Sequence, residues 1–269
     1  MSVHLVSDEK IAETSSKGNQ EKWLENGRWY KLDQFGYEAL AETLISGLLE
    51  RSGLERSTKF QFVRYRMERI CVHGRERTGC SSENFLEPGR SIVTLSHLLR
   101  RLEAEPLSAL LSRLPSDRKR VAFLAERTAE LTGLSDFPEY LALLFELDAR
   151  FLNDDRHLNN IAVLEKNGKY DYCPIFDNGA GLLSNVMTAP LEISPKAFLP
   201  AMRASPFQMS FSRQLHTVQS LYGAGPILPE FSEKELREEL APLLEYYPSR
   251  DRALIADRVC TVILERQRK

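Results

Sequence analysis

The chain has 269 residues and a formal net charge of −2, with 36 basic and 38 acidic residues. This length suffices for one large domain or for two lobes that share a cleft, and the balanced charge gives no overall basic footprint for nucleic acid. No run approaches the ~18 apolar residues that a membrane-spanning helix needs, and residues 1–10 lack the apolar core of a signal peptide. We therefore expect a cytoplasmic protein without a membrane span, and signal-independent secretion stays open.

The cysteines and histidines give no sign of a structural metal. The four cysteines show no Cys-x-x-Cys pairing, and the five histidines are not clustered. A zinc site is therefore not expected. Free thiols are the default interpretation for a cytoplasmic chain.

The front of the chain predicts a β-rich region. Residues 13–20, Glu-Thr-Ser-Ser-Lys-Gly-Asn-Gln, form a small polar run with one glycine, and taken alone this run is most simply a surface loop. Apolar and aromatic residues at 22–24 and 28–32 flank an Asn-Gly turn and predict a hairpin. Lys31 lies on the second strand of this hairpin, a position where sheets also place lysines that discourage aggregation.

A helix is predicted at residues 36–52, where apolar residues repeat at helical spacing and Gly53 provides a stop. Glu38 and Glu42 lie one turn apart on one flank of its apolar stripe. Residues 60–65 alternate as a half-buried strand should, and the run from 80 to 86 leads out of this region.

After residue 90 the pattern becomes helical. We predict helices at 94–103, 116–131, 140–148 and 249–266. Asp136 with Glu139, and Ser232 with Glu235, form capping-box patterns at two helix starts. We interpret Asp148 and Arg150, at the end of the third of these helices, as ordinary helix-end charges rather than as partners of the loop that follows.

The most informative stretch is residues 153–160, Asn-Asp-Asp-Arg-His-Leu-Asn-Asn. Two apolar runs joined by an Asn-Gly turn follow it, and the second leads into Phe-Asp-Asn-Gly at 176–179. This pattern is a strong hairpin signal, and because paired strands lie about 5 Å apart, Asn160 and Asp177 are expected to converge at the open end. Asp155 lies on the polar loop near the same place.

This layout predicts a kinase. In protein kinases a first Asp accepts or orients the substrate hydroxyl proton, and an Asn and a second Asp hold Mg²⁺ against the phosphates, a role that suits hard oxygen ligands. Asp155 is then the catalytic base, Asn160 and Asp177 are the metal ligands, and His157 braces the loop. The alternative is a polar loop before a surface hairpin, with His157 as a structural residue.

These motifs resemble those of the HipA-like serine/threonine kinases. The resemblance rests on residues 153–160, on Pro-Ile-Phe-Asp-Asn-Gly at 174–179, and on Ser15, Gly18, Gln20 and Lys22 at the spacing of the family's Ser-x-x-Gly-x-Gln-x-Lys loop. It covers roughly residues 13–180. It implies an α+β, two-lobed protein-kinase-like fold, with a small β-rich N-lobe at 1–88 and a mainly helical C-lobe at 89–269.

The resemblance also implies roles for several residues of the front lobe. Lys31 is expected to reach the phosphates of ATP, and a helix glutamate, Glu42 rather than Glu38, is expected to hold that lysine. In the family the serine of the loop is an autophosphorylation site, a role that falls to Ser15 with its neighbour Ser16 as the alternative.

Three further residues are expected to contact the nucleotide. Gly18 belongs to the loop that covers the phosphates. Glu83 and Phe85 fall in the connection between the lobes, where the family's backbone meets the adenine edge.

Substrate and partners are less constrained. The implied activity is transfer of a phosphoryl group from ATP to a hydroxyl of an unidentified protein. The Asp-Arg-His-x-x-Asn core also looks like that of phosphatidylinositol 3- and 4-kinases, so a phosphoinositide or small-molecule kinase is the alternative, and a silent binding module of kinase shape is the third hypothesis. No direct contact with nucleic acid is expected.

HipA-like toxins commonly carry an additional front subdomain and pair with an antitoxin. This chain begins almost at the nucleotide loop, so we expect that subdomain to be missing or supplied by another protein. A toxin role and an antitoxin or other small partner protein both stay open. The sequence after Gly179 carries no Ala-Pro-Glu, which is consistent with the HipA-like group and departs from eukaryotic protein kinases.

Overall fold

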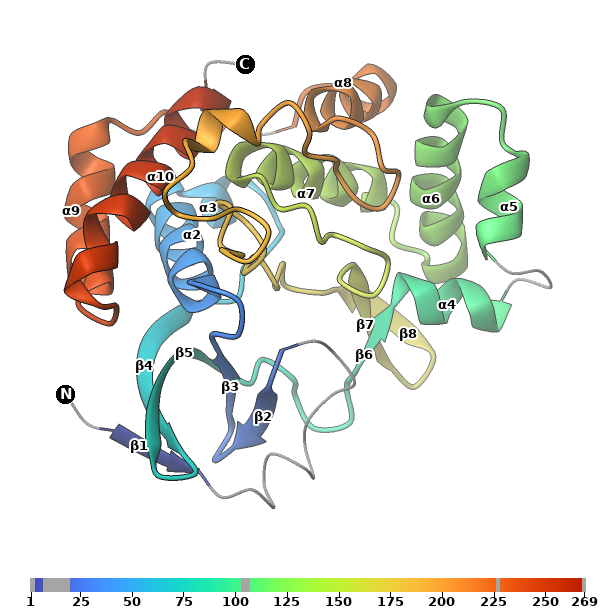
Figure 1. The fold of residues 1–269 in the computed structure, drawn as a ribbon. Helices are drawn as coiled ribbons and strands as arrows, with labels where there is room; N and C mark the ends of the chain where they lie inside the picture. Colours follow the sequence, from blue (N-terminus) through green and yellow to red (C-terminus); the bar gives the residue numbers. More distant parts are fainter. Residues whose placement is uncertain (1–2, 7–19, 103–106, 226–227, 268–269) are drawn as a thin grey trace.

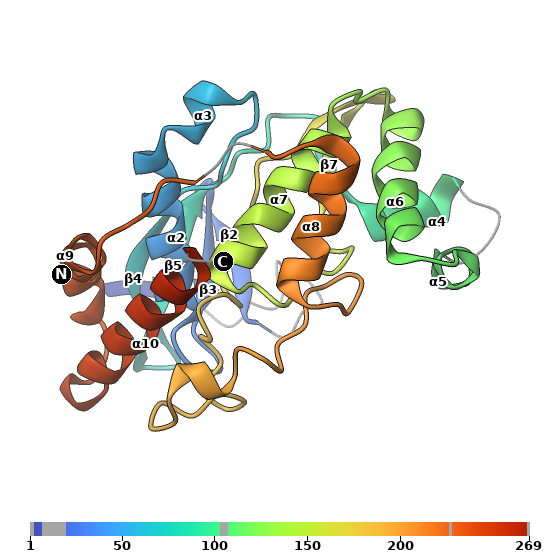
Figure 2. The same cartoon turned by 90° about the horizontal axis from the view of Figure 1, so that it is seen from above.

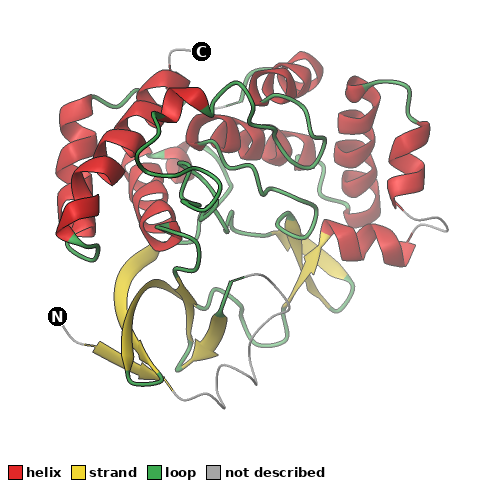
Figure 3. Ribbon diagram, in the orientation of Figure 1, coloured by secondary structure: helices red, strands yellow, loops and turns green. Residues whose placement is uncertain are grey.

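The computed structural model of the protein describes residues 3–6, 20–102, 107–225 and 228–267. The strands up to residue 83 form one sheet, and helices dominate the rest of the chain, with a second, smaller sheet beside them (Figures 1 and 3). The described elements, in chain order, are β1 (Val3–Val6), β2 (Lys22–Glu25), β3 (Arg28–Leu32), α2 (Glu38–Ser52), α3 (Leu54–Ser57), β4 (Tyr65–Val72), β5 (Arg75–Glu83), β6 (Ser91–Thr94), α4 (Leu95–Leu102), α5 (Leu107–Arg113), α6 (Asp117–Thr132), α7 (Phe137–Phe151), β7 (Ala162–Lys166), β8 (Lys169–Tyr172), the 3₁₀ turn η1 (Pro195–Ala197), α8 (Phe211–Tyr222), α9 (Glu233–Leu244) and α10 (Ser249–Gln267). No helix among the described residues has the length and apolarity to cross a membrane.

The first sheet has five strands in the order β1-β4-β5-β3-β2. β1 pairs with β4 in parallel, and the remaining pairs are antiparallel. The predicted hairpin is confirmed as β2 and β3, whose turn residues Asn26 and Gly27 both have positive φ, as a two-residue hairpin turn requires. Trp23 stacks on Tyr30 across this ladder, with 5.5 Å between ring centroids.

The strand predicted at residues 60–65 is wrong in its position, because β4 begins only at Tyr65. Phe62 lies in an isolated bridge with Ile175, and Phe60 packs edge-on against the rings of Tyr140 and Tyr172. The alternating apolar residues therefore indicate only that one side of this segment is buried. An extended loop that packs on the core gives the same alternation as a strand.

Helix α2 confirms the helix predicted at 36–52 and begins two residues later, at Glu38. It packs against β4 and β5, and α9 covers its other side (Figures 1 and 2). The segment between α9 and α10 also holds the start of this helix. Tyr247 donates its hydroxyl to Asp33 Oδ2 at 2.7 Å, and Asp33 Oδ1 accepts from the Ala39 amide at 2.6 Å.

The helical part is built around α7, in which twelve of fifteen residues are buried. α6, α8 and α10 pack around it (Figure 2). Beside them, β6, β7 and β8 form an antiparallel sheet, and β7 with β8 confirms the hairpin predicted between Asn160 and Asp177. The predicted α+β class, with a β-rich front and a helical back, is thus confirmed.

The two capping-box predictions had different outcomes. Ser232 and Glu235 form the reciprocal cap at the start of α9. The box predicted at Asp136 and Glu139 is wrong, because the Asp136 side chain makes no cap hydrogen bond. Its carboxylate instead contacts the ammonium of Lys59 from the crossing loop. The ion pair with Lys59, which is distant in the sequence, has therefore replaced the expected local hydrogen bond to the helix start.

The contact of Tyr247 with Asp33 gives a stability prediction. The Tyr247→Phe substitution removes the hydroxyl that the half-buried Asp33 carboxylate accepts from, so we expect a loss of about 1–3 kcal/mol of unfolding free energy, measured by urea denaturation. Tyr246→Phe is the matched control, because its hydroxyl makes only a long 3.5 Å contact with the Met67 carbonyl. Equal losses in the two variants would contradict the role of Asp33 as the anchor of α2.

Candidate active site

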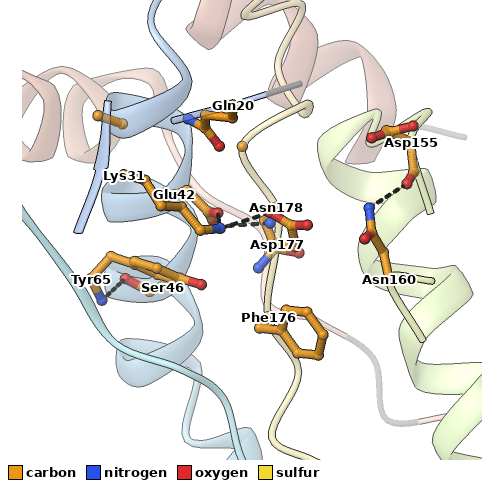
Figure 4. Close-up of polar contacts among 12 residues, drawn as sticks. Gln20, Lys31, Glu42, Ser46, Tyr65, Asp155, Asn160, Phe176, Asp177 and Asn178 are labelled. Carbon is orange, nitrogen blue, oxygen red and sulfur yellow. Dashed lines mark hydrogen bonds and ion pairs between the residues drawn. The ribbon is translucent and has the colours of Figure 1, made fainter. Parts of the chain in front are cut away.

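Three charged side chains from distant parts of the sequence meet at one point (Figure 4). The Lys31 Nζ, from β3, lies 2.6 Å from Glu42 Oε1 of α2 and 2.7 Å from Asp177 Oδ1 in the segment after β8. Lys31 and Glu42 are buried, and the Asp177 side chain is 22% exposed. The structure therefore pairs the expected strand lysine with the expected helix glutamate, and it adds Asp177 to the pair.

The electrostatics of this cluster keep its members charged. Burial acts to lower the pKa of Lys31, but the carboxylates of Asp177 and Glu42 outweigh it and hold that pKa well above its ordinary value. Burial acts to raise the pKa of Asp177, and the ammonium groups of Lys31 and Lys22 outweigh it, so this pKa lies below its ordinary value. Asp177 is therefore an ionised carboxylate at neutral pH, as a metal ligand must be.

Glu38, the other glutamate considered for Lys31, has different partners. Its Oε1 accepts from the Phe35 amide at 2.7 Å and its Oε2 from the Gly36 amide at 3.1 Å. Glu38 thus satisfies the backbone of the loop that leads into α2, and Glu42 one turn later faces the lysine.

Asp177 has a φ of +63°, in the left-handed region that few non-glycine residues adopt. Two hydrogen bonds hold the peptide group that follows Asp177. The Asn178 amide donates to Glu42 Oε2 at 2.8 Å, and Asn153 Nδ2 donates to the Asp177 carbonyl at 3.2 Å. A sparsely populated backbone conformation that neighbouring groups enforce is typical of functional sites.

Arg156 is the residue that the motif contained and the sequence interpretation missed. Its side chain is fully buried, and its Nε lies 3.1 and 3.2 Å from the two carboxylate oxygens of Asp148. Its remaining nitrogens donate to the Phe176 carbonyl at 2.6 Å, to Asn178 Oδ1 at 2.6 Å and to the Asn160 carbonyl at 3.3 Å. One guanidinium thus joins the end of α7, the loop that carries Asp155 and the segment that carries Asp177.

The interpretation of Asp148 as an ordinary helix-end charge is therefore wrong. This carboxylate is 1% exposed, and burial raises its pKa to about 6 while the charge of Arg156 opposes that rise. Arg150 has a separate partner, Glu146 one turn earlier in α7 at 3.8 Å. Helix α7 ends at Phe151, between Asp148 and Arg156, so the two residues share no helix or strand, and only the way in which the chain folds back makes them partners.

Asp155, His157 and Asn160 share one loop. Asn160 Nδ2 donates to the Asp155 carbonyl at 2.9 Å, and its amide oxygen faces Asp177 (Figure 4). The His157 Nε2 lies 3.7 Å from Asp155 Oδ1, and both side chains are exposed. Burial of the carboxyl group raises the pKa of Asp155, the nearby His157 lowers it and the charge of Asp177 raises it again, with a net rise.

The donor set suits Mg²⁺ rather than a metal held by protein alone. Asp177 offers a carboxylate oxygen that Lys31 does not occupy, and Asn160 offers an amide oxygen. Among the described residues there is no group of three or more His, Cys, Asp or Glu side chains that could hold a metal ion without help. Magnesium accepts few protein ligands when phosphate and water complete its shell.

The structure also places Lys22 near this site, a residue that the sequence analysis named only as part of the loop motif. Lys22 lies directly opposite Lys31 in the β2–β3 ladder. Burial lowers the pKa of Lys22, the charge of Asp177 raises it and that of Lys31 lowers it, with a net fall. Gln20, two residues before Lys22, donates to the Leu32 carbonyl at 2.7 Å. Ser15, Ser16 and Gly18 lie outside the described residues.

The connection between the two sheets provides an apolar surface. Phe85, Leu86 and Phe176 pack on a small cluster formed by Ala162, Leu164 and Cys173. Phe176 immediately precedes Asp177, so this surface is continuous with the charged site (Figure 4). The side chain of Glu83 is not part of it, because it is exposed and contacts Arg28 and Arg66 on the sheet.

Comparisons with known proteins bear on the fold. No protein-family model and no curated protein matches the sequence. Among solved structures, the proinflammatory kinase CtkA of Helicobacter pylori matches with a TM-score of 0.59 at 13% identity, over 95% of this chain and 89% of that one. A HipA chain from the HipA, HipB and operator DNA complex of Shewanella oneidensis matches with a TM-score of 0.46 at 15% identity, over 94% of this chain and 64% of that one. The chain thus has the fold of the CtkA kinase, and the predicted kinase-like fold is confirmed.

The buried Arg156–Asp148 pair gives the second prediction. The Arg156→Met substitution leaves Asp148 buried without its partner, so we expect a loss of about 3–5 kcal/mol of unfolding free energy. The double variant Arg156→Met/Asp148→Leu should recover part of this loss, because no unpaired charge then stays in the core.

Arg237 is the control for this prediction. Its side chain is 46% exposed and pairs with Glu233 and Asp257, so Arg237→Met should cost about 1 kcal/mol or less. Urea denaturation of all the variants decides the matter. A loss for Arg156→Met no larger than that for Arg237→Met would contradict the central role of Arg156.

Proposed function

We propose that the protein is an ATP- and Mg²⁺-dependent serine/threonine protein kinase. The observation that carries this proposal is the simultaneous contact of Lys31 with Glu42 and Asp177, next to the loop of Asp155 and Asn160. Phosphoryl transfer needs positioned charge more than covalent participation by the protein. The kinase fold and this arrangement of residue types both support the assignment.

The nucleotide would lie between the charged cluster and the apolar surface. Phe85 and Phe176 offer an apolar wall for the base, a role typical of ligand pockets. Lys31 would bind the phosphates, and Glu42 keeps its ammonium group in place. Lys22 offers a second cation on the same side of the ladder. When bound, ATP supplies the phosphoryl group that is transferred.

Asp177 and Asn160 would hold Mg²⁺, which when bound neutralises charge on the phosphates. Asp155 is the group that orients the substrate hydroxyl and accepts its proton. Its exposure lets an external hydroxyl reach it, and Arg156 immediately after it anchors the loop to the core. His157 positions the Asp155 carboxylate through the 3.7 Å contact.

Autophosphorylation at Ser15, or at its neighbour Ser16, belongs to this proposal. Gln20 anchors the exit of that loop to β3, so the serines lie a few residues upstream of the anchored Gln20 and Lys22. A phosphoserine carries about −1.5 to −2 charge at neutral pH. Such a group would compete with the phosphates of ATP for Lys22 and Lys31, which would limit the activity of the modified protein.

The roles of the two aspartates give the third prediction. After incubation with ATP and Mg²⁺, the wild-type protein should gain at least one phosphate by intact-mass analysis, mapped to Ser15 or Ser16. Asp155→Asn should lower the transfer rate about 10²–10⁴-fold, the range for loss of a general acid–base group, and leave nucleotide binding nearly unchanged. Asp177→Asn should weaken both, because it removes a metal ligand.

Asp154→Asn is the matched control, a neighbouring carboxylate that the proposal gives no chemical role. Its rate should stay within a few-fold of wild type. Transfer by Asp155→Asn at the wild-type rate would show that the base has been misassigned. Absence of both transfer and nucleotide binding in the wild type would instead favour a silent module of kinase shape.

The contact of His157 with Asp155 gives a pH prediction. Asp155 must be ionised to accept a proton, so the transfer rate should fall as pH falls through its pKa. The nearby His157 lowers the pKa of Asp155, so His157→Gln should move the acid limb to higher pH. Both side chains are exposed, so solvent screens their interaction and the shift should be small.

The measurement is the pH dependence of kcat/KM for phosphate transfer. A purely structural role for His157 would change the rate at every pH without moving the limb. His216→Gln on α8 is the control, because that histidine is exposed and far along the chain from the loop. Its acid limb should coincide with that of the wild type.

A further inference from the structure

A second concave site lies on the helical part of the molecule, apart from the Lys31 cluster. It is a cavity of about 500 Å³ between the start of α6, the start of α8 and the loop that precedes α8. Its walls carry three arginines, Arg120, Arg203 and Arg213, and one acidic residue, Asp117. Phe207 and Met209 of the loop supply apolar surface. We call this cavity the arginine pocket.

The arginine pocket has an excess of positive charge. Asp117 is shared, because Arg120 lies 3.1 Å from its Oδ1 and Arg213 contacts its Oδ2. Arg203 donates to the carbonyls of Pro200 and Met202 at 3.0 and 2.9 Å, and no carboxylate of the described residues pairs with it. Three guanidinium groups therefore face one carboxylate, in a chain whose net charge is −2.

The loop that carries Arg203 is internally braced. The Ala204 amide donates to the Met209 carbonyl at 2.7 Å, which closes the loop at its base. Phe207 packs edge-on against Phe145 of α7, with 6.2 Å between ring centroids. The buried Gln214 of α8 donates to the Ser205 carbonyl at 2.9 Å. These contacts therefore fix the backbone of the loop that follows Arg203.

The same loop is bonded to the catalytic loop. The Ser205 hydroxyl donates to the Asp154 carbonyl at 2.7 Å, one residue before Asp155. Two residues of chain span at most about 7 Å, so through this bond the Cα atom of Arg203 lies within about 15 Å of that of Asp155. An extended peptide advances about 3.3 Å per residue, so this separation corresponds to about three to six residues of a bound substrate.

We propose that the arginine pocket binds an anionic side chain of the protein substrate, a carboxylate or a phosphorylated residue, about three to six positions from the hydroxyl that receives the phosphoryl group. This proposal rests on the proposed kinase function and adds a substrate preference to it. Guanidinium groups match carboxylate and phosphate oxygens in a paired geometry. The apolar wall of Phe207 and Met209 suits a peptide stem better than the repeating charge of a nucleic acid.

Binding of labelled peptides tests the pocket directly. Fluorescein-labelled peptides with a central Ser in an Ala/Gly background would carry Glu, phosphoserine, Gln or Lys at one position, three to six residues to either side. Fluorescence anisotropy would give the affinity for the full-length protein, and phosphate transfer to the same peptides would be measured separately. A ten-nucleotide RNA of mixed sequence would be a further probe.

The wild type should bind the best Glu or phosphoserine peptide about tenfold more tightly than its Gln counterpart, as expected for one charge-assisted hydrogen bond. Arg203→Gln should abolish this preference, and Arg203→Glu should reverse it in favour of the Lys peptide. Lys234→Glu is the control of equal charge change, because that lysine is 85% exposed on α9. It should leave the preference intact.

Several results would overturn the proposal. These are a wild type without acidic preference, a preference unchanged by both Arg203 variants, and an Arg203-dependent affinity for RNA that exceeds the affinity for every peptide. Arg203-dependent binding without phosphate transfer would support the pocket and contradict the kinase function. Phosphate transfer that is unaffected by the Arg203 variants would support the kinase function and contradict the role of the pocket.

Discussion

The ammonium group of Lys31 and its two carboxylate partners are the contact on which the rest of the site depends. Lys31 belongs to β3, Glu42 to α2 and Asp177 to the segment after β8, so this one cation joins three elements that lie far apart in the sequence. Burying three charges is costly unless each is paired and hydrogen-bonded. The second oxygen of Glu42 accepts from the Asn178 amide, which completes the pairing. The cluster therefore stabilises the site only when all three elements are in place.

Arg156 holds the backbone segments of the site together, as Lys31 holds its charged side chains together. Its guanidinium contacts Asp148 at the end of α7, the carbonyl of Phe176 and the side chain of Asn178. A planar group with five donors can hold several segments at once, which a lysine at the same place could not. The loop of Asp155 and the segment of Asp177 thus share a single buried anchor, although Asp155 itself stays exposed.

Helix α2 links these anchors to the C-terminal part of the chain. Its first turn is held through Asp33 by Tyr247, and α9 packs along its outer side. Glu42 is therefore presented to Lys31 by a helix held from both ends of the sequence. The same principle applies at the arginine pocket, where a braced loop is bonded to the catalytic loop through Ser205. In each case a functional side chain lies on a segment whose position distant parts of the chain determine.

Local patterns in the amino-acid sequence predict the helices, the hairpins and the residue types that the chemistry needs. The Asn26-Gly27 turn, the helical period of 36–52 and the hairpin after Asn160 are local signals, and each produced the predicted element. The tertiary structure alone decided the partners. It gave Asp136 a lysine in place of a helix cap and made an extended loop of the strand-like pattern at residues 60–65. The difference arises from the distance along the chain over which each interaction acts. Caps, turns and helical periods depend on residues a few positions apart. A buried ion pair such as that of Asp148 and Arg156 instead needs the whole core to exclude water around it.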